Sequence, residues 1–243
     1  MISLWNTALY NPLYNGLIFL IGIMPLTSVG LAVIVLTILV RLAIFPLVHK
    51  SIKTQRKMRE LEPELKKIRE RHKDKQEQAK QTMELYKAHG TNPFSGCLTV
   101  LIQLPILIAL FFVFRDGFAE NAGILYSFVH YPGNISPDFL GVNLQERSYV
   151  LAVLVGVSQY FYTTLSLPKT TPSAGEKTFQ EEFARSMNMQ MRYIFPVLFV
   201  VFSLSIPSAV ALYWVTSNMF SIGQELFVRY GGKEKLLTQN EPR

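Results

Sequence analysis

Arg41 is the residue whose position in this sequence most strongly suggests a function. It lies inside the apolar run from Gly30 to Val48, eleven residues after Gly30 and nine before Lys50. At the rise of an α-helix these intervals correspond to about 16 Å and 13 Å, so a membrane-spanning helix would hold Arg41 near mid-bilayer. An arginine at that depth costs about 2.5–3.5 kcal/mol on insertion scales, and such residues usually serve a function.

The usual compensation for a charge at this depth is a nearby acid, and the sequence offers none. Asp and Glu are absent from four apolar stretches, residues 25–48, 97–114, 149–167 and 193–224. Glu225 follows the last of them, near the far end of that span. Because an arginine without a counter-ion in its span is tolerable beside water, we expect a hydrated cavity around Arg41. The alternative is that the guanidinium binds backbone carbonyls of neighbouring helices.

Polar residues of the same stretches are the candidates for lining this cavity. They are Thr37, Gln103, Gln159, Thr163, Ser203, Ser205, Thr216, Ser217 and Asn218. Thr37 is one turn from Arg41, and Gln159 and Thr163 share a helix face because they are four residues apart. For each Ser and Thr the alternative is a hydroxyl that bonds to the backbone of its own helix.

Other chemistry finds little support in the sequence. The four histidines and the single cysteine are His49, His72, His89, His130 and Cys97. Their spacing matches no metal site, and one cysteine allows no intrachain disulfide. No nucleophile–base pair falls within the apolar stretches and no GxxxxGK[ST] phosphate loop occurs, so we expect no catalytic residues, no cofactor and no enzyme. The lack of intramembrane acids also argues against ion-coupled transport.

The elements that must position Arg41 are apolar stretches long enough to be transmembrane helices. The chain is 49% hydrophobic and 17% charged, whereas a soluble domain averages about 25% charged residues. A span needs about 20 mostly apolar residues. The expected spans are residues 29–48, 97–115, 149–167, 193–206 and 209–228. The expected fold class is an all-α polytopic membrane protein with five transmembrane helices, a cytoplasmic helical hairpin and an N-terminal interfacial helix.

Residues 1–28 are predicted to be an extracytoplasmic or interfacial segment. No basic residue precedes Arg41, so a signal peptide with a basic start is not indicated. We expect Pro12 to Met24 to form an interfacial or half-buried helix, with a sixth span in residues 1–24 as the alternative.

The basic residues indicate the orientation. Of the 24 Lys and Arg, 13 lie in residues 49–96, four in 168–192 and four in 229–243. By the positive-inside rule these segments face the cytoplasm, so the N-terminus and the loop 116–148 lie outside. The net charge of +7 thus reports topology in a cell-membrane protein, with contact to ribosomal RNA as a secondary possibility.

The cytoplasmic segment 49–96 has the pattern of two helices. Apolar residues recur at three- and four-residue spacing in two groups, Met58, Leu61, Leu65, Ile68 and then Ala79, Met83, Tyr86. This spacing gives each helix one apolar stripe. Pro63 is expected to kink or restart the first helix. A solvated charged linker is the alternative.

A family resemblance rests on motifs that keep one order along the chain. They are Gly30–Ile34, Arg41–Leu47, Lys50, Gln55, Lys57–Met58, Leu61–Glu64, Glu84–Lys87, Gly90, Asn92–Pro93, Gly96–Leu98, Leu101–Gln103, Pro105–Ile106, Pro207–Ser208, Leu212–Trp214 and Ser217–Asn218. Together they resemble the YidC-type (YidC/Oxa/Alb) membrane protein insertases over most of residues 25–230.

The resemblance implies a five-helix core with a groove open to the cytoplasm and to lipid and closed on the outer side. Arg41 would attract the hydrophilic, often acidic, N-terminal segment of a nascent membrane protein, whose apolar segment then enters the lipid. It also places Trp214 and a polar residue of the third span in the groove, either Thr163 or Gln159. Implied partners are nascent membrane proteins, the lipid bilayer, the ribosome through residues 55–88 and 229–243, a Sec translocon and a targeting receptor.

A function of a different class is also compatible with Arg41. An anion channel or solute transporter could use this arginine as its selectivity charge. That reading predicts a continuous pore across both leaflets, whereas the insertase reading predicts a cavity closed on the outer side.

Overall fold

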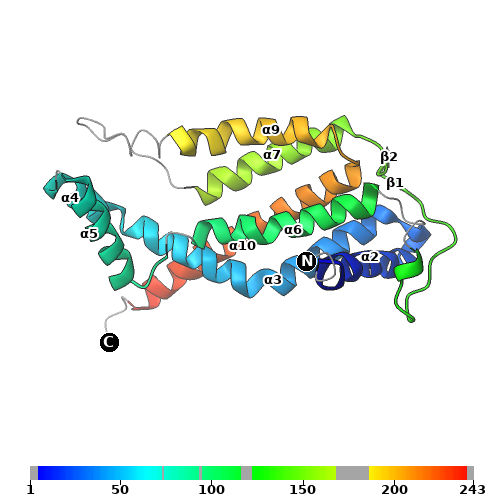
Figure 1. The fold of residues 1–243 in the computed structure, drawn as a ribbon, viewed down its shortest axis with the longest axis horizontal. Helices are drawn as coiled ribbons and strands as arrows, with labels where there is room; N and C mark the ends of the chain where they lie inside the picture. The colour runs from blue at the N-terminus through cyan, green and yellow to red at the C-terminus, as the bar shows by residue number, and fades with distance from the viewer. Residues whose placement is uncertain (1–4, 73, 93–94, 116–121, 168–185, 240–243) are drawn as a thin grey trace. The chain divides into compact units, whose positions relative to one another are not determined.

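The computed structural model is mostly helical. It describes residues 5–72, 74–92, 95–115, 122–167 and 186–239. The chain divides into two compact units, Met1–Ala43 with Pro105–Glu225 and Ile44–Leu104 with Leu226–Arg243. Helices α3 (Val29–Glu60), α6 (Ser95–Arg115) and α10 (Ser208–Gln239) each contribute to both units, which are described separately below (Figure 1).

The N-terminal part of the first unit is helical before the first predicted span. A π-helical turn, η1 (Asn6–Tyr10), leads into α2 (Asn11–Ile23), which has Pro12 in its first turn. Tyr14, Leu17, Ile18 and Ile21 are fully buried. A Cβ added at Gly16 would lie 3.4 Å from Leu36 of α3, so α2 packs closely on that helix. The short 3-10 helix η2 (Pro25–Thr27) then leads into α3.

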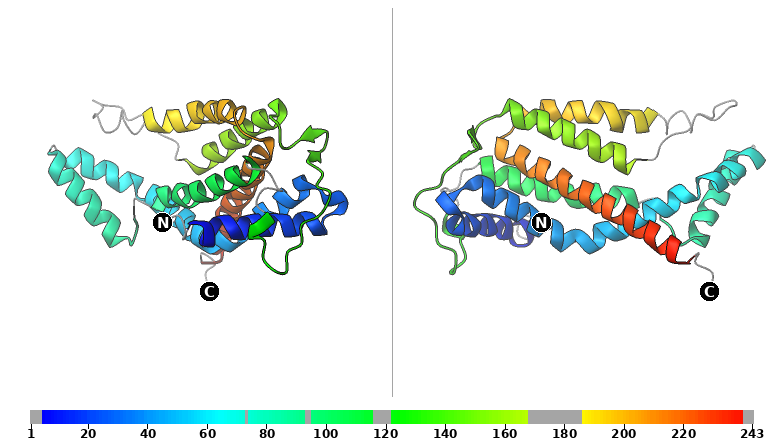
Figure 2. Two further views of the ribbon diagram at one scale, coloured as in Figure 1. Left: turned by 45° about the vertical axis from the view of Figure 1, so that its right-hand side comes forward. Right: turned by 180° about the vertical axis from the view of Figure 1, so that it is seen from behind.

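Helices α7 (Tyr149–Ser166) and α9 (Phe195–Ser203) form an antiparallel pair, which Figure 2 shows from two further directions. The Ser148 hydroxyl accepts a hydrogen bond from Leu151 N at 3.3 Å and caps the start of α7. At Gly156 a Cβ would lie only 2.3 Å from Val200 Cγ2, so the close approach of the two helices requires glycine. A π-helical turn, η4 (Gln190–Ile194), precedes α9 and begins before the span predicted at 193–206.

The extracytoplasmic loop predicted at 116–148 contains structure that the sequence pattern did not indicate. Its described part holds η3 (Ala122–Ile124) and an antiparallel pair of two-residue strands, β1 (Asp138–Phe139) and β2 (Val142–Asn143). The turn between the strands places Leu140 and Gly141 at φ of 51° and 78°. Such a short ribbon has no long alternating pattern by which sequence analysis could find it.

This loop holds the first residues of two helices in the first unit. Val29 N of α3 donates to Ser136 O at 3.2 Å. Ser208 N and Ala209 N of α10 donate to the carbonyls of Glu146 and Leu144 at 2.8 and 2.9 Å. Backbone N–H groups at a helix start have no partner within the helix, so the loop carbonyls satisfy them.

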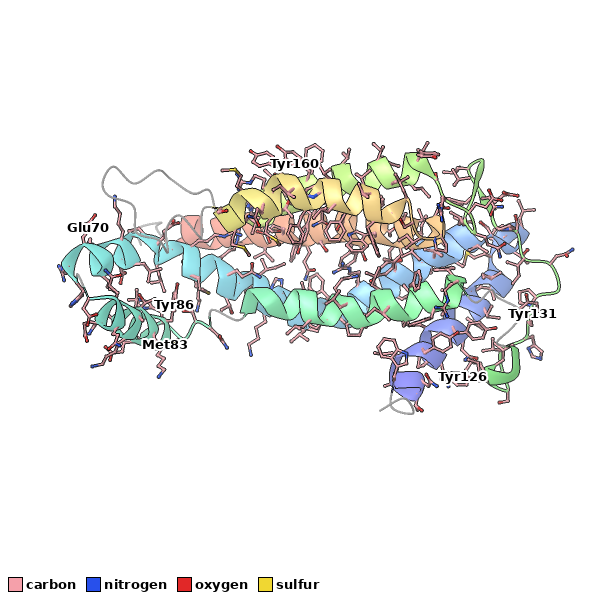
Figure 3. The ribbon with its side chains drawn as sticks, turned by 45° about the horizontal axis from the view of Figure 1, so that its top comes forward. Glu70, Met83, Tyr86, Tyr126, Tyr131 and Tyr160 are labelled. Atoms are coloured by element: carbon pink, nitrogen blue, oxygen red, sulfur yellow. The ribbon has the colours of Figure 1, made fainter. Side chains whose placement is uncertain are left out.

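Asn15 fixes a second part of the loop to α2. Its Nδ2 donates to Ile124 O at 3.1 Å, and its Oδ1 accepts from Tyr126 N at 2.6 Å. Figure 3 shows Tyr126 beside this N-terminal helix. Asn15 is only 2% exposed, so its carboxamide replaces water as the partner of both loop backbone groups.

In the second unit α3 continues well beyond the predicted span end at Val48. It runs through Pro46 to Glu60, because the residues from Lys50 onward are mostly strong helix formers. Val48 and Ile52 pack against Val228 of α10, and the Arg56 side chain donates to Val228 O at 2.6 Å. Burial, with the Lys53 charge as a second cause, lowers the pKa of the His49 imidazole.

The segment after α3 forms a helical hairpin, α4 (Glu62–Arg71) and α5 (Lys75–Ala88). The restart predicted at Pro63 is present, since α3 ends at Glu60 and α4 begins with Pro63 in its first turn. Asp74 caps α5 by accepting from Gln76 N at 3.1 Å. Glu70 of α4 and Met83 and Tyr86 of α5 are labelled in Figure 3.

Two of the helices, α3 and α7, are long and apolar enough to cross a membrane, judged by length and composition over the described part of the chain. Residues 101–115 of α6 form a shorter apolar helical stretch.

Candidate functional site

Arg41 lies on the buried face of α3. Val33, Thr37 and Arg41 follow one another at four-residue intervals and are 2%, 2% and 6% exposed. Arg41 Nε donates a hydrogen bond of 3.1 Å to the hydroxyl of Ser217 on α10. The guanidinium also interacts electrostatically with Tyr213 of α10 and Tyr162 of α7. Three helices of the first unit therefore surround the arginine.

A second group of hydrogen bonds joins α7 to α10. Gln159 Oε1 accepts from Trp214 Nε1 at 3.1 Å and from Asn218 Nδ2 at 3.2 Å. Asn218 Nδ2 also donates to Ser158 Oγ at 3.1 Å. The Trp214 ring packs against Phe199 of α9, with ring centroids 4.4 Å apart. The tryptophan therefore presents an apolar face to α9 and its N–H to the carboxamide.

These two groups meet on α10, where Ser217 and Asn218 are consecutive. We call the set the polar cluster, which consists of Arg41, Ser158, Gln159, Trp214, Ser217 and Asn218. Ser158, Gln159, Ser217 and Asn218 are 9% exposed or less. Buried polar atoms of this kind stabilise a structure only when they are hydrogen-bonded, and the cluster meets that condition through side chains of three helices.

Several predicted lining residues use their hydroxyl groups within their own helix. Thr37 donates to Val33 O at 2.6 Å, Thr163 to Gln159 O at 2.8 Å and Thr216 to Leu212 O at 2.8 Å. Each of these hydroxyl groups therefore bonds to the backbone of its own helix, as Ser and Thr in apolar helices often do. Of the two third-span candidates, Gln159 takes part in the polar cluster, whereas Thr163 is bonded to its own helix.

Gln103 is a predicted lining residue that lies outside the first unit, which holds the polar cluster. It is half-buried on α6 and belongs to the second unit. Its role in the groove stays a prediction from the sequence.

Two buried residues of the first unit were not among the predicted lining residues. Ser158 bonds to Asn218, but a serine inside an apolar helix carries no signal that separates it from a packing residue. Glu225, which the sequence places near the end of the last span, is 3% exposed. Its spacing from Ser217, eight residues along α10, is the signal that places both on one helix face.

The side chains of the polar cluster are suited to binding a negatively charged group. The cluster combines one cation with neutral hydrogen-bonding groups, and a guanidinium is the side chain best matched to a carboxylate. Within the described residues no group of three or more His, Cys, Asp or Glu could hold a metal ion.

The fold and this site define a class, the helical membrane proteins that keep a buried arginine among polar side chains. The chain belongs to the 60Kd inner membrane protein family, whose model matches residues 19–235. This finding confirms the YidC-type resemblance drawn from the motifs.

Similar proteins are membrane protein insertases by name. The chain is 34% identical over 232 residues to YidC of Fusobacterium nucleatum, covering 92% of this chain and 98% of the relative. It is 30% identical to MisCA of Bacillus subtilis, with 93% and 79% covered. It is 34% identical to YidC of Streptomyces avermitilis, with 82% of this chain covered but only 50% of that relative.

A solved structure is also similar. A crystal structure of an active YidC insertase with the first transmembrane domain resolved matches with a TM-score of 0.59 and 26% identity. The match covers 90% of this chain and 46% of the other. The chain thus spans about half of that protein and of the Streptomyces relative, and nearly all of the Fusobacterium one.

Proposed function

We propose that this protein is a membrane protein insertase and folding chaperone of the cell membrane. It receives nascent membrane proteins in a hydrated, positively charged groove that includes the polar cluster, and it releases their apolar segments into the bilayer. The observation that carries the proposal is Arg41, which is 6% exposed in an apolar helix and hydrogen-bonded to Ser217. The insertase names of the relatives support the same function.

The mechanism follows from electrostatics and partitioning. A buried guanidinium attracts carboxylates strongly because the surrounding dielectric constant is lower than that of water. A hydrated groove shortens the apolar distance that a polar tail must cross. Transfer of the substrate's apolar segment into lipid then supplies the driving force, and the membrane potential assists acidic tails.

The topology that fits this mechanism has five transmembrane helices, with the N-terminus outside and the C-terminus in the cytoplasm. The groove opens to the cytoplasm and to lipid. Ribosome contact through residues 55–88 and 229–243, a Sec translocon and a targeting receptor belong to the same proposal. The positive-inside count of basic residues supports this orientation.

The channel alternative requires a path past the outer loop. The Phe139 ring contacts α3 so closely that a Cβ at Gly30 would lie 2.1 Å from it, and loop carbonyls hold the starts of α3 and α10. These contacts favour a groove closed on the outer side. Cysteine accessibility scanning along α3 tests this: label entering positions near Gly30 as readily as positions near Phe45 would favour a channel.

The direct test replaces the insertase of a depleted host with variants at Arg41. Arg41→Glu should reduce insertion of a single-span substrate with an acidic N-tail at least ten-fold, because attraction becomes repulsion. Arg41→Lys should retain most insertion, since a point charge suffices. Arg147→Glu makes the same charge change at an exposed residue of the outer loop and is the matched control. Full insertion by Arg41→Glu would refute the electrostatic mechanism.

A further inference from the structure

A buried polar stripe continues along α10 beyond the polar cluster. Ser217, Ser221 and Glu225 follow at four-residue intervals and are 1%, 5% and 3% exposed. Ser221 Oγ donates to Ser217 O at 2.9 Å, so the serine hydroxyl is used within the helix. Glu225 is therefore the residue of this stripe that can carry a charge.

Glu225 lies farther from the outer loop than Arg41 does. The loop holds the starts of α3 and α10, and it serves as a common reference for both helices. Arg41 is twelve residues into α3, or about 18 Å, and Glu225 is seventeen residues into α10, or about 26 Å. On the proposed topology Glu225 thus lies near the cytoplasmic end of the groove and Arg41 lies deeper.

Tyr162 of α7 links the two charges. Both Arg41 and Glu225 influence the ionisation of this half-buried phenol, so both charges lie within electrostatic range of one side chain. The carboxylate therefore acts on the same region of the first unit as the guanidinium. A substrate tail that enters from the cytoplasmic side therefore meets the negative charge of Glu225 before it reaches Arg41.

A carboxylate buried to this degree is expensive. Removing an acid from water costs several kcal/mol, and an apolar or amide side chain of similar size would pack at less cost. Ionisable residues within or at the edge of spans are for that reason usually functional. The free-energy cost of burying Glu225 therefore indicates that this carboxylate has a function that the neutral Ser217 and Ser221 cannot provide.

We infer that Glu225 is a second recognition charge of the groove, which binds a lysine or arginine of the substrate tail while Arg41 binds an acidic residue of the same tail. The inference rests on the proposed insertase function. Glu225 follows Ser217, the partner of Arg41, by eight residues, or about 12 Å of helix. An extended chain covers that distance in about four residues. The preferred tail therefore carries an acid followed about four residues later by a base.

The order of the two charges follows from their depths. An N-tail enters with its amino end leading, so its more N-terminal charge meets the deeper group. The acid must therefore precede the base. A tail with the reverse order would place like charges together at both positions.

The experiment measures insertion of matched single-span substrates in an insertase-depleted host. Each N-tail carries one Asp. Four residues after this Asp, one substrate has Lys and another has Gln. A third substrate, the spacing control, has its Lys ten residues after the Asp. The wild-type chain should insert the Lys+4 substrate about five-fold better than the Gln+4 substrate, the factor expected of a partly desolvated ion pair. Glu225→Gln should abolish this ratio, because insertion of the Lys+4 substrate falls to the level of the Gln+4 substrate.

Two further variants separate recognition from folding. Glu225→Asp keeps the charge and should restore most of the ratio, whereas Ser221→Ala, one turn away on the same face, should leave it unchanged. An unchanged ratio in Glu225→Gln, or equal loss of both substrates, would overturn the inference. Failure of the wild-type chain to insert any of the substrates would instead refute the proposed function itself.

Discussion

At the scale of single residues, the site depends on two adjacent side chains of α10. Ser217 accepts from Arg41, and Asn218 donates to Ser158 and to Gln159. Because consecutive helix residues point about 100° apart, this pair reaches α3 and α7 at once. Small changes on α10 should therefore alter the environment of the arginine.

Ser217→Ala should destabilise the protein by about 1–3 kcal/mol, because it removes the acceptor of a buried, charged donor. Ser221→Ala is the matched control, since that hydroxyl bonds to its own helix and is equally buried. Thermal unfolding in one detergent compares the two. An equal loss of stability in both variants would show that the Arg41–Ser217 hydrogen bond contributes no more to stability than a hydrogen bond within the helix.

Leu140 is a second informative residue, because it adopts a φ of 51° and is 88% exposed. Leucine pays a steric cost in the left-handed region, whereas asparagine tolerates it. Leu140→Asn should raise the unfolding free energy by about 0.5–1 kcal/mol. Gly141→Ala should lower it, since Gly141 has a φ of 78°. Loss of stability in both variants would contradict this account of the turn.

At the scale of elements, the loop of residues 122–148 holds the starts of two helices together. It bonds α3 at Val29 and α10 at Ser208 and Ala209, and Phe139 lies on Gly30. The loop has little regular structure of its own, so its geometry depends on these contacts. Opening it should affect the outer closure of the groove before it affects the rest of the fold.

Gly30→Leu should displace the strand pair β1–β2, because its side chain would occupy the space of the Phe139 ring. The expected result is faster protease cleavage in residues 136–146 from the outer side. Adding Phe139→Ala should restore protection in part, as expected of a direct steric contact. If the effects of the two substitutions on the cleavage rate simply add, a direct contact between the two side chains is contradicted.

At the scale of the whole molecule, helices α3, α6 and α10 run through both compact units. The first unit holds the polar cluster, and the second holds the helical hairpin α4–α5. We propose that the first unit recognises the substrate and that the second contacts cytoplasmic partners.

Deleting the helical hairpin should reduce insertion while leaving the polar cluster folded. The structure refines the deletion, because Arg56 bonds to Val228 and residues through Glu60 belong to α3. Replacing 62–88 with a short Gly-Ser linker preserves those contacts, whereas removing 55–88 does not. Normal insertion by the 62–88 replacement, measured beside the wild-type chain in the depleted host, would refute a role for the hairpin.

The sequence by itself determined the helical class, the family and the residue on which the proposed function rests. Apolar length and charge counts are local properties, so they identify spans and an arginine within one of them. The restart at Pro63 was also predictable, because proline limits its own and its neighbour's backbone.

Only the tertiary structure decided which side chains meet. Ser217 is 176 residues from Arg41, and helical periodicity does not tell which of several polar faces will pack together. The same reason separates Gln159, which joins the polar cluster, from Thr163, which bonds within its helix. The burial of Glu225 depends on the helices around it, which the sequence does not specify. Only the tertiary structure therefore shows that this carboxylate is buried and that it lies near Tyr162 of α7.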